Sequence, residues 1–130
     1  MLVIDASALF DMLTDRPNGA AIGDRLISDP DHAAPHIIDV EVFGAIRRDL
    51  QRGLLDHTQA THAVTKLAAW PGQRFAQQLL LGRAWELRDT VRGWDAMYVA
   101  LAEALDAPLV TLDARLAGAP GPVCRIDVIG

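Results

Sequence analysis

Short apolar runs alternate along this chain with longer segments in which apolar residues recur every three or four positions. Short runs bounded by turn residues are typical of strands buried on both faces of a parallel sheet. Recurrence at three or four positions is typical of amphipathic helices. The pattern predicts strands at 2–4, 32–34, 74–76, 109–112 and 123–129, and helices at 5–13, 21–27, 38–52, 56–69, 79–88 and 94–105.

Three of these helices carry sharper signals than the others. Segment 38–52 has apolar positions at intervals of three or four and ends at a glycine, which commonly stops a helix. Asp56 followed by Gln59 resembles a capping box, in which two side chains bond the first helical turn. Segment 94–105 has the clearest apolar stripe. These three helices therefore have the strongest local signals in the sequence.

The alternation of strands and helices determines the expected fold class. Strands separated by helices indicate an α/β protein with a parallel sheet. We expect a three-layer sandwich, with a central and mostly parallel sheet between helices on both faces. A chain of 130 residues is long enough for one domain, so we expect a single domain over 1–130.

Composition narrows the function classes. Hydrophobic residues make up 51% and charged residues 22%, which excludes intrinsic disorder. The net charge of −5 argues against binding nucleic acid through a generally basic surface, but not through a bound cation. A lone Cys124 excludes an internal disulfide and is expected to be a small buried apolar residue. No signal peptide or membrane-length run is visible, so we expect a cytoplasmic protein.

Four acidic residues stand at the ends of predicted elements. Asp5 directly follows the first strand, and Asp113 directly follows the strand at 109–112. Glu41 and Asp95 lie in the first turns of two predicted helices. In open α/β sheets, ligands gather beyond the carboxyl ends of the strands. We therefore expect these four side chains to be candidates for one site.

Each acid alone has an ordinary explanation. Asp5 and Asp95 suit helix starts, Asp113 suits a turn, and Glu41 suits a solvated helix face. If the four converge, however, their carboxylates repel and cannot all stay ionised without help. A hard divalent cation such as Mg²⁺ removes that conflict and prefers oxygen ligands. Convergence would therefore predict a metal site.

Several motifs carry a resemblance to a known family. Val3-Ile-Asp-Ala-Ser7 opens the chain, and Pro35-His-Ile-Ile-Asp-Val-Glu-Val42 follows the second strand. Trp94-Asp-Ala-Met-Tyr-Val-Ala-Leu-Ala-Glu103 and Leu109-Val-Thr-Leu-Asp-Ala-Arg-Leu116 come later, with Arg83-Ala-Trp-Glu-Leu-Arg88 before them. In order, spacing and context these segments resemble PIN-domain ribonucleases, in particular the VapC-type toxins of toxin–antitoxin pairs.

This resemblance implies a PIN fold and an endoribonuclease that depends on Mg²⁺ or Mn²⁺. It implies that Asp5, Glu41, Asp95 and Asp113 are the metal-binding, catalytic acids. An RNA substrate, a cognate antitoxin protein and a homodimer are implied by the family as well.

Some neighbouring residues are secondary candidates. Ser7 and Thr111 match polar positions beside the acids in the family, and Trp94 stands where a tyrosine is common. Arg92 and Arg115 are candidate RNA contacts, because both lie close in sequence to a candidate acid. The ordinary alternative for both arginines is a solvated surface charge.

Other functions use a similar arrangement of acids. A PIN-like nuclease of RNA maturation, or one that cleaves DNA without any antitoxin, would need the same four residues. A phospho-acceptor receiver domain also places acids at the ends of parallel strands, but it needs a lysine near them. The only lysine is Lys66, inside a predicted helix, which disfavours a receiver.

The middle of the chain holds an apolar cluster whose role the sequence leaves open. Its members are Trp70, Phe75, Leu79, Leu80, Leu81 and Trp85. They could form a dimer or antitoxin-binding surface, or they could be ordinary core. The four histidines fall outside the acid motifs, so no histidine is expected to take part in catalysis: His32, His36, His57 and His62.

Overall fold

A computed structural model describes all 130 residues and shows a five-stranded sheet in the order β3-β2-β1-β4-β5. Every neighbouring pair of strands is parallel, as the short buried runs predicted. The strands are β1 (Leu2–Ile4), β2 (His32–Pro35), β3 (Gln73–Phe75), β4 (Leu109–Thr111) and β5 (Ile126–Val128).

Helices connect all the strands. They are α1 (Ala6–Leu13), α2 (Gly19–Ile27), α3 (Ile37–Gln51), α4 (His57–Ala69), the 3-10 helix η1 (Gln77–Leu80), α5 (Leu81–Glu86), α6 (Asp95–Ala104) and α7 (Ala114–Gly118).

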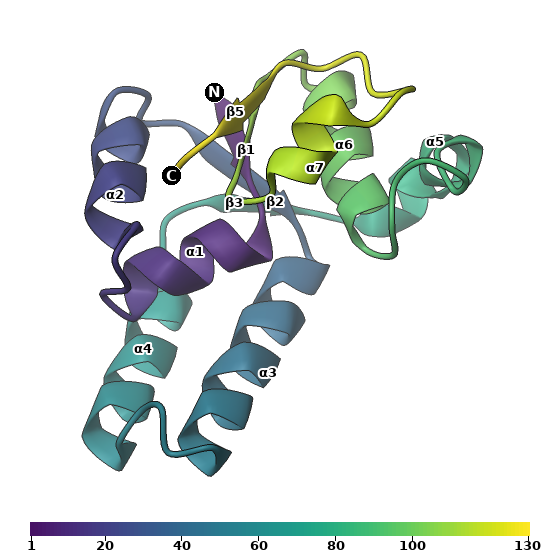
Figure 1. The fold of residues 1–130 in the computed structure, drawn as a ribbon. Helices are drawn as coiled ribbons and strands as arrows, with labels where there is room; N and C mark the ends of the chain where they lie inside the picture. Colours follow the sequence, from purple (N-terminus) through teal and green to yellow (C-terminus); the bar gives the residue numbers. More distant parts are fainter.

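The helices form layers on the two sides of the sheet (Figure 1). On one side α1 contacts α2, and on the other α6 packs against β1, β2 and β4. Helices α3 and α4 pack against each other and extend beyond the sheet as a helical hairpin (Figure 1). The expected three-layer α/β sandwich is therefore confirmed.

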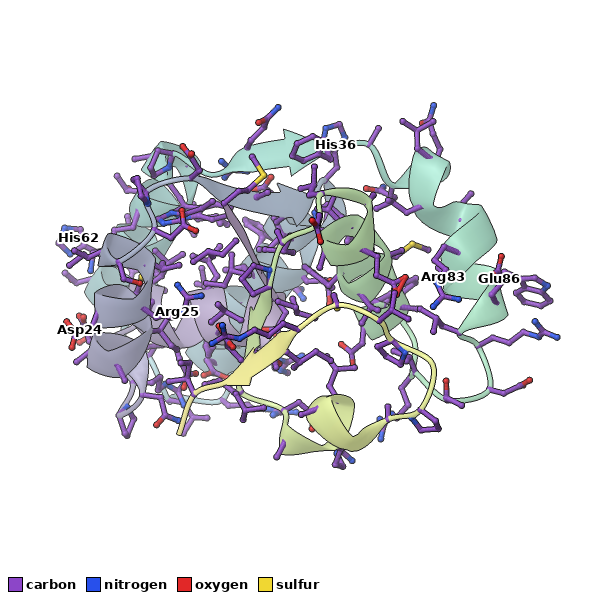
Figure 2. The ribbon with its side chains drawn as sticks, turned by 90° about the horizontal axis from the view of Figure 1, so that it is seen from above. Asp24, Arg25, His36, His62, Arg83 and Glu86 are labelled. Atoms are coloured by element: carbon purple, nitrogen blue, oxygen red, sulfur yellow. The ribbon has the colours of Figure 1, made fainter.

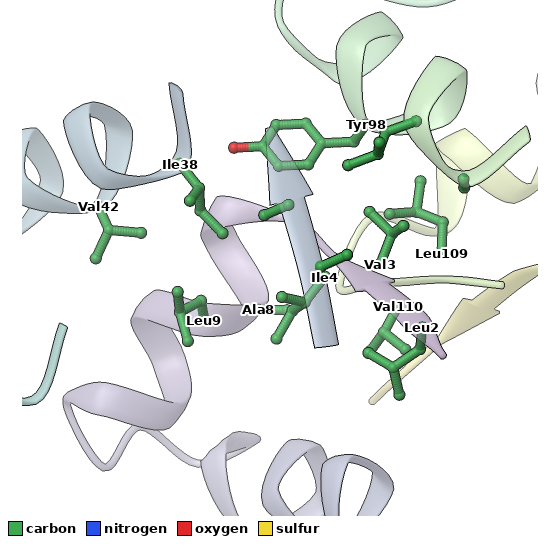
Figure 3. Close-up of a cluster of buried hydrophobic side chains, with 14 of the residues drawn as sticks. Leu2, Val3, Ile4, Ala8, Leu9, Ile38, Val42, Tyr98, Leu109 and Val110 are labelled. Atoms are coloured by element: carbon green, nitrogen blue, oxygen red, sulfur yellow. The ribbon is translucent and has the colours of Figure 1, made fainter. Parts of the chain in front are cut away.

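The core lies on both faces of β1. Leu2, Val3 and Ile4 are all fully buried, which is why this strand is apolar at three consecutive positions. Figure 3 shows these residues between Leu9 on one side and Tyr98 on the other. The buried strand thus places the residue that follows it, Asp5, at a rigid position.

Most element bounds agree with the expected ones within two residues. The main differences lie after residue 76: the helix expected at 79–88 is a 3-10 turn followed by the short α5. The expected last strand, 123–129, shortens to β5, because it pairs only with β4 and lies at the sheet edge. Helix α7 was not expected, since five residues are too few for a periodic signal.

The apolar cluster of the middle segment divides into two parts. Trp70 and Leu80 are buried in the core, whereas Leu79 and Trp85 are 85% and 68% exposed. The core interpretation is therefore correct for Trp70 and Leu80. Leu81 is exposed, as Leu79 and Trp85 are. Cys124 was expected to be a small buried apolar residue, and it is partly buried and packs against the core.

A polar network joins α5, α6 and the C-terminal segment. Arg83 on α5 donates hydrogen bonds to Glu103 on α6 from Nε at 2.6 Å and from Nη2 at 3.1 Å. Figure 2 shows Arg83 reaching from α5 towards the body of the protein. Glu103 also accepts a hydrogen bond from the backbone N–H of Val123.

No helix in this fold combines the length and apolar character required to cross a bilayer.

Candidate active site

The sheet order brings two of the four acids together. Asp5 follows β1 and Asp113 follows β4, and these two strands are neighbours in the sheet. Their carboxyl ends point the same way because the strands are parallel. Both side chains also cap a helix: Asp5 accepts from the N–H of Ala8 in α1, and Asp113 accepts from the N–H of Arg115 in α7.

The other two acids lie near the starts of two helices, and each of these helices connects a different pair of strands. Glu41 lies in the second turn of α3, the helix that follows β2. Asp95 is the first residue of α6, which packs across β1 and β2. Each of the four acids therefore comes from a different element, and a fold of this type is needed to assemble them.

Asp5 is the most buried acid of the group and the most firmly held. Its Oδ1 accepts hydrogen bonds from the Ser7 hydroxyl and the Ala8 N–H, both at 3.0 Å. Its Oδ2 accepts a hydrogen bond from the Thr111 hydroxyl. The Thr111 oxygen in turn accepts from the N–H of Asp113 at 3.1 Å. Ser7 and Thr111 thus orient Asp5, and Thr111 also links Asp5 to Asp113.

Glu41 is positioned by a residue that the sequence did not single out. The Tyr98 hydroxyl donates to Glu41 Oε1 at 2.7 Å. Figure 3 shows the Tyr98 ring within the core with its hydroxyl directed towards α3. Tyr98 lies three residues after Asp95 on α6, and this helical spacing was the signal that could have identified it.

Charge interactions connect the four acids through Asp5 and Asp95. Burial raises the pKa of Asp5, and the charge of Asp113 adds to the increase. Burial also raises the pKa of Glu41, with further increases from Asp95 and Asp5. The pKa of Asp95 is raised by burial and by the charges of Asp5 and Asp113. The structure therefore brings all four candidate acids into one interacting cluster.

Asp113 differs from the other three because an arginine neutralises it. Hydrogen bonds from the Arg115 side chain are the main reason that the pKa of Asp113 lies below its ordinary value. Arg115 Nε lies 3.2 Å from Asp113 Oδ1, and Nη2 lies 3.4 Å from Oδ2. The charge of Arg92 lowers the pKa of Asp113 further and offsets part of the increase in the pKa of Asp95.

The chemistry of the four carboxylates suits a hard cation, but the side chains are not arranged as a complete set of ligands. Four carboxylates supply only oxygen ligands, and their mutual repulsion is the conflict that a divalent cation relieves. No three acidic, histidine or cysteine side chains stand close enough to form a ready set of ligands. Internal donors hold Asp5, Glu41 and Asp113, so the side chains would have to turn towards an ion.

Two hollows adjoin the cluster. One has a volume of about 70 Å³ and is lined by Arg92 and Arg115 beside Asp95 and Asp113. The other, of about 580 Å³, lies between α1 and α3 and includes Glu41, with Trp94 on its rim. Both hollows open beside the acids, so an extended substrate could lie across them.

The remaining polar candidates lie elsewhere. Lys66 pairs with Asp15 at 3.8 Å, beyond the C-terminal end of α1, whereas Asp5 precedes its start. An eight-residue helix is about 12 Å long, so Lys66 cannot hold a phosphoryl group on Asp5. His32 Nε2 faces the backbone carbonyls of Leu26 and Asp29. The receiver interpretation therefore lacks its lysine.

Comparison with known proteins decides the family. The family model "PIN domain" matches residues 2–121. The chain belongs to the PIN-domain family. Its sequence is 39% identical to ribonuclease VapC12 of Mycobacterium tuberculosis over 129 residues, which cover 99% of both chains. It is 38% identical to ribonuclease VapC1 of the same organism, over 98% of this chain and 96% of that one.

Solved structures agree with this PIN fold. A toxin–antitoxin complex from Klebsiella pneumoniae contains a chain with a TM-score of 0.70 and 20% identity, covering 98% of this PIN domain and 97% of that chain. PAE2754 from Pyrobaculum aerophilum has a TM-score of 0.69 at 23% identity, over 98% of this chain and 83% of that one. At these identities the likeness concerns the fold alone.

Proposed function

We propose that this PIN domain is a metal-dependent endoribonuclease and the toxin of a toxin–antitoxin pair. The printed names of the VapC relatives support the ribonuclease activity, and the Klebsiella complex supports an antitoxin partner. The observation that carries the proposal is the cluster of four carboxylates from four elements, beyond the carboxyl ends of β1 and β4. A homodimer stays a prediction.

Mg²⁺ or Mn²⁺ is the cofactor that this donor set suits. Asp5, Asp95 and Asp113 would hold the ion, and Glu41 would complete the set directly or through a water molecule. A bound ion of this kind lowers the pKa of water and offsets charge on a phosphodiester. The net charge of −5 is then compatible with a polyanionic substrate, because the ion supplies the local positive charge.

The chain's own residues would prepare the site. Ser7 and Thr111 keep one Asp5 conformation through their hydrogen bonds, and Tyr98 does the same for Glu41. These hydrogen bonds define the positions from which the two carboxylates would turn towards an ion. Water attacking the phosphorus in line with the 3′ oxygen leaves products with 5′-phosphate and 3′-hydroxyl ends.

The proposal is tested by replacing one acid that caps no helix. Asp95→Asn removes a carboxylate charge from the cluster and keeps the shape of the side chain. We expect cleavage of single-stranded RNA in Mg²⁺ to fall at least a hundredfold, because the ion would lose one of its ligands. The matched control is Asp24→Asn, on the exposed outer face of α2 (Figure 2), which should retain wild-type cleavage. Gel analysis of end-labelled RNA measures both rates and the product ends.

Two results would reject this assignment. One is undiminished Mg²⁺-dependent cleavage by Asp95→Asn, and the other is equal cleavage by the wild type in EDTA and in Mg²⁺. Single-stranded DNA of the same sequence belongs in every assay. Faster cleavage of that DNA than of RNA would favour the alternative PIN-like DNA nuclease.

A further inference from the structure

The smaller hollow beside the acids is lined by opposite charges. Its lining includes the acids Asp95 and Asp113 together with Arg92, Arg115 and Thr90. Its volume of about 70 Å³ is suited to a small group rather than a nucleobase. Arg92 and Arg115 are the two cations whose charges act on both Asp95 and Asp113, in a protein whose net charge is −5.

Arg92 has hydrogen-bonding capacity that the protein does not use. Its exposed guanidinium donates no hydrogen bond to any acceptor of the chain, although it stands beside two carboxylates. A guanidinium carries five N–H donors in a planar fork that matches the oxygens of a phosphate. The side chain is therefore available for a ligand.

Arg115 holds Asp113 only loosely. Its two contacts, at 3.2 and 3.4 Å, are long for charge-assisted hydrogen bonds, and the side chain is 75% exposed. Exposed ion pairs of this kind contribute little stability. The Arg115 guanidinium can therefore leave Asp113 at small cost.

The proposed metal would change what the arginines are needed for. Without a cation, Arg92 and Arg115 are the counter-charges that offset the acids. A divalent cation held by the acids would supply that positive charge instead, and Asp113 would then no longer need Arg115 as its counter-charge. Both guanidinium groups would then line the hollow without a carboxylate partner.

We propose that Arg92 and Arg115 form a subsite for one backbone phosphate of the RNA, adjacent to the phosphate that is cleaved. This inference rests on the proposed function, because it assumes that RNA lies across the acid cluster. The two arginines are positioning residues: they hold the neighbouring phosphate and set the register of the chain over the acids. A bound anion between them would also offset the repulsion between the two cations.

The test removes one charge from each partner in turn. The substrate is an oligoribonucleotide whose cleavage position has been mapped, with each flanking phosphodiester replaced singly by a neutral methylphosphonate. For the wild type, we expect one of these replacements to lower kcat/KM about tenfold, mostly through KM. For Arg92→Gln and for Arg115→Gln, the same replacement should lower kcat/KM by clearly less than in the wild type, because one of the two charge partners of that phosphate is already absent.

Arg52→Gln is the matched control. Arg52 is an exposed arginine at the end of α3, about 16 Å along the helix from Glu41. Its loss removes the same charge from the protein, and it should leave the methylphosphonate effect at its wild-type size. If Arg92→Gln and Arg115→Gln keep the full methylphosphonate effect, the two arginines are counter-ions only and the subsite is overturned.

A binding measurement separates this subsite from the nuclease proposal. In the Asp95→Asn background, fluorescence anisotropy of the labelled RNA in Mg²⁺ gives Kd at several salt concentrations. Adding Arg92→Gln should reduce the slope of log Kd against log salt by about 0.7, the value for one lost phosphate contact on a single strand. That reduction without any wild-type cleavage would reject the nuclease and keep the subsite. An unchanged slope would reject the subsite, even if the wild type cleaves RNA.

Discussion

At the scale of single residues, the candidate site is a set of side chains that oppose folding. Asp5, Glu41 and Asp95 all have pKa values raised by burial, with neighbouring carboxylates adding to the effect. A raised pKa means that the folded state binds protons more readily than the unfolded state. Each such acid therefore lowers the free energy of unfolding once the pH rises above its ordinary pKa.

Asp95→Asn should make the metal-free protein more stable. Above about pH 4, the ordinary pKa of an aspartate, the ionised Asp95 of the wild type lowers the free energy of unfolding, and the variant lacks this charge. We expect a higher Tm than that of the wild type in EDTA at pH 7, and no difference near pH 3. Differential scanning fluorimetry over this pH range measures both.

The same pair of proteins should respond differently to metal. Mg²⁺ at 100 times its Kd should add about 2.7 kcal/mol to the wild type, and less to Asp95→Asn. An identical Tm for the wild type in EDTA and in millimolar Mg²⁺ would contradict a metal site at these acids.

At the scale of elements, local signals were strongest where a cap and an apolar stripe coincide. The capping box expected at α4 is present: the Gln59 N–H donates to Asp56 Oδ1 at 2.7 Å, and the Asp56 N–H donates to Gln59 Oε1 at 2.8 Å. Both bonds lie within four residues, so no tertiary structure is needed to form them. Helix α7 carries only one cap and no stripe, which is why it was missed.

Asp56→Ala should destabilise the protein through its effect on α4. Loss of the side-chain cap leaves the N–H of Gln59 without its partner, and N-cap replacements of this kind cost about 1 kcal/mol. Urea unfolding at pH 7 measures the change. The control is Asp24→Ala, which alters net charge equally at an exposed position without a side-chain hydrogen bond, and it should stay within about 0.5 kcal/mol of wild type. Equal losses in both variants would show that charge, not capping, is responsible.

At the scale of the whole molecule, strand order assembles the site, and helix packing forms a supporting ion pair. β1 lies between β2 and β4, so the acids that follow β1 and β4 meet although 108 positions separate Asp5 from Asp113. Near the C-terminal end of α6, Glu103 ties this helix to α5 and to the C-terminal segment. These contacts join parts of the chain that are distant in sequence.

Glu103→Gln should reveal this network as a pH-dependent stability. Burial acts to raise the pKa of Glu103, but bonds from Arg83 and the Val123 N–H outweigh it, and the net shift is downward. A lowered pKa adds stability above the ordinary value, near 4.5, and that stability is lost as the pH falls below it. We expect the variant to be about 1–2 kcal/mol less stable at pH 7. Urea unfolding from pH 7 to pH 3 should show the two proteins converging, and a constant gap would contradict the role of the charge.

The sequence by itself determined the features that depend on neighbours along the chain. Three consecutive apolar residues identified β1 as buried on both faces, and Asp56 with Gln59 identified the start of α4. The motifs around Asp5, Glu41, Asp95 and Asp113 identified the PIN family, since order and spacing are properties of sequence. Alternating strands and helices were enough for the fold class.

Only the tertiary structure decided which distant side chains meet. It paired Tyr98 with Glu41 and Thr111 with Asp5, and it put Leu80 in the core while leaving Trp85 exposed. The physical reason is that hydrogen bonds and burial depend on distance in space, which sheet order and helix packing set. The pattern of apolar and polar residues does not by itself give those distances, because they are set only when the chain folds.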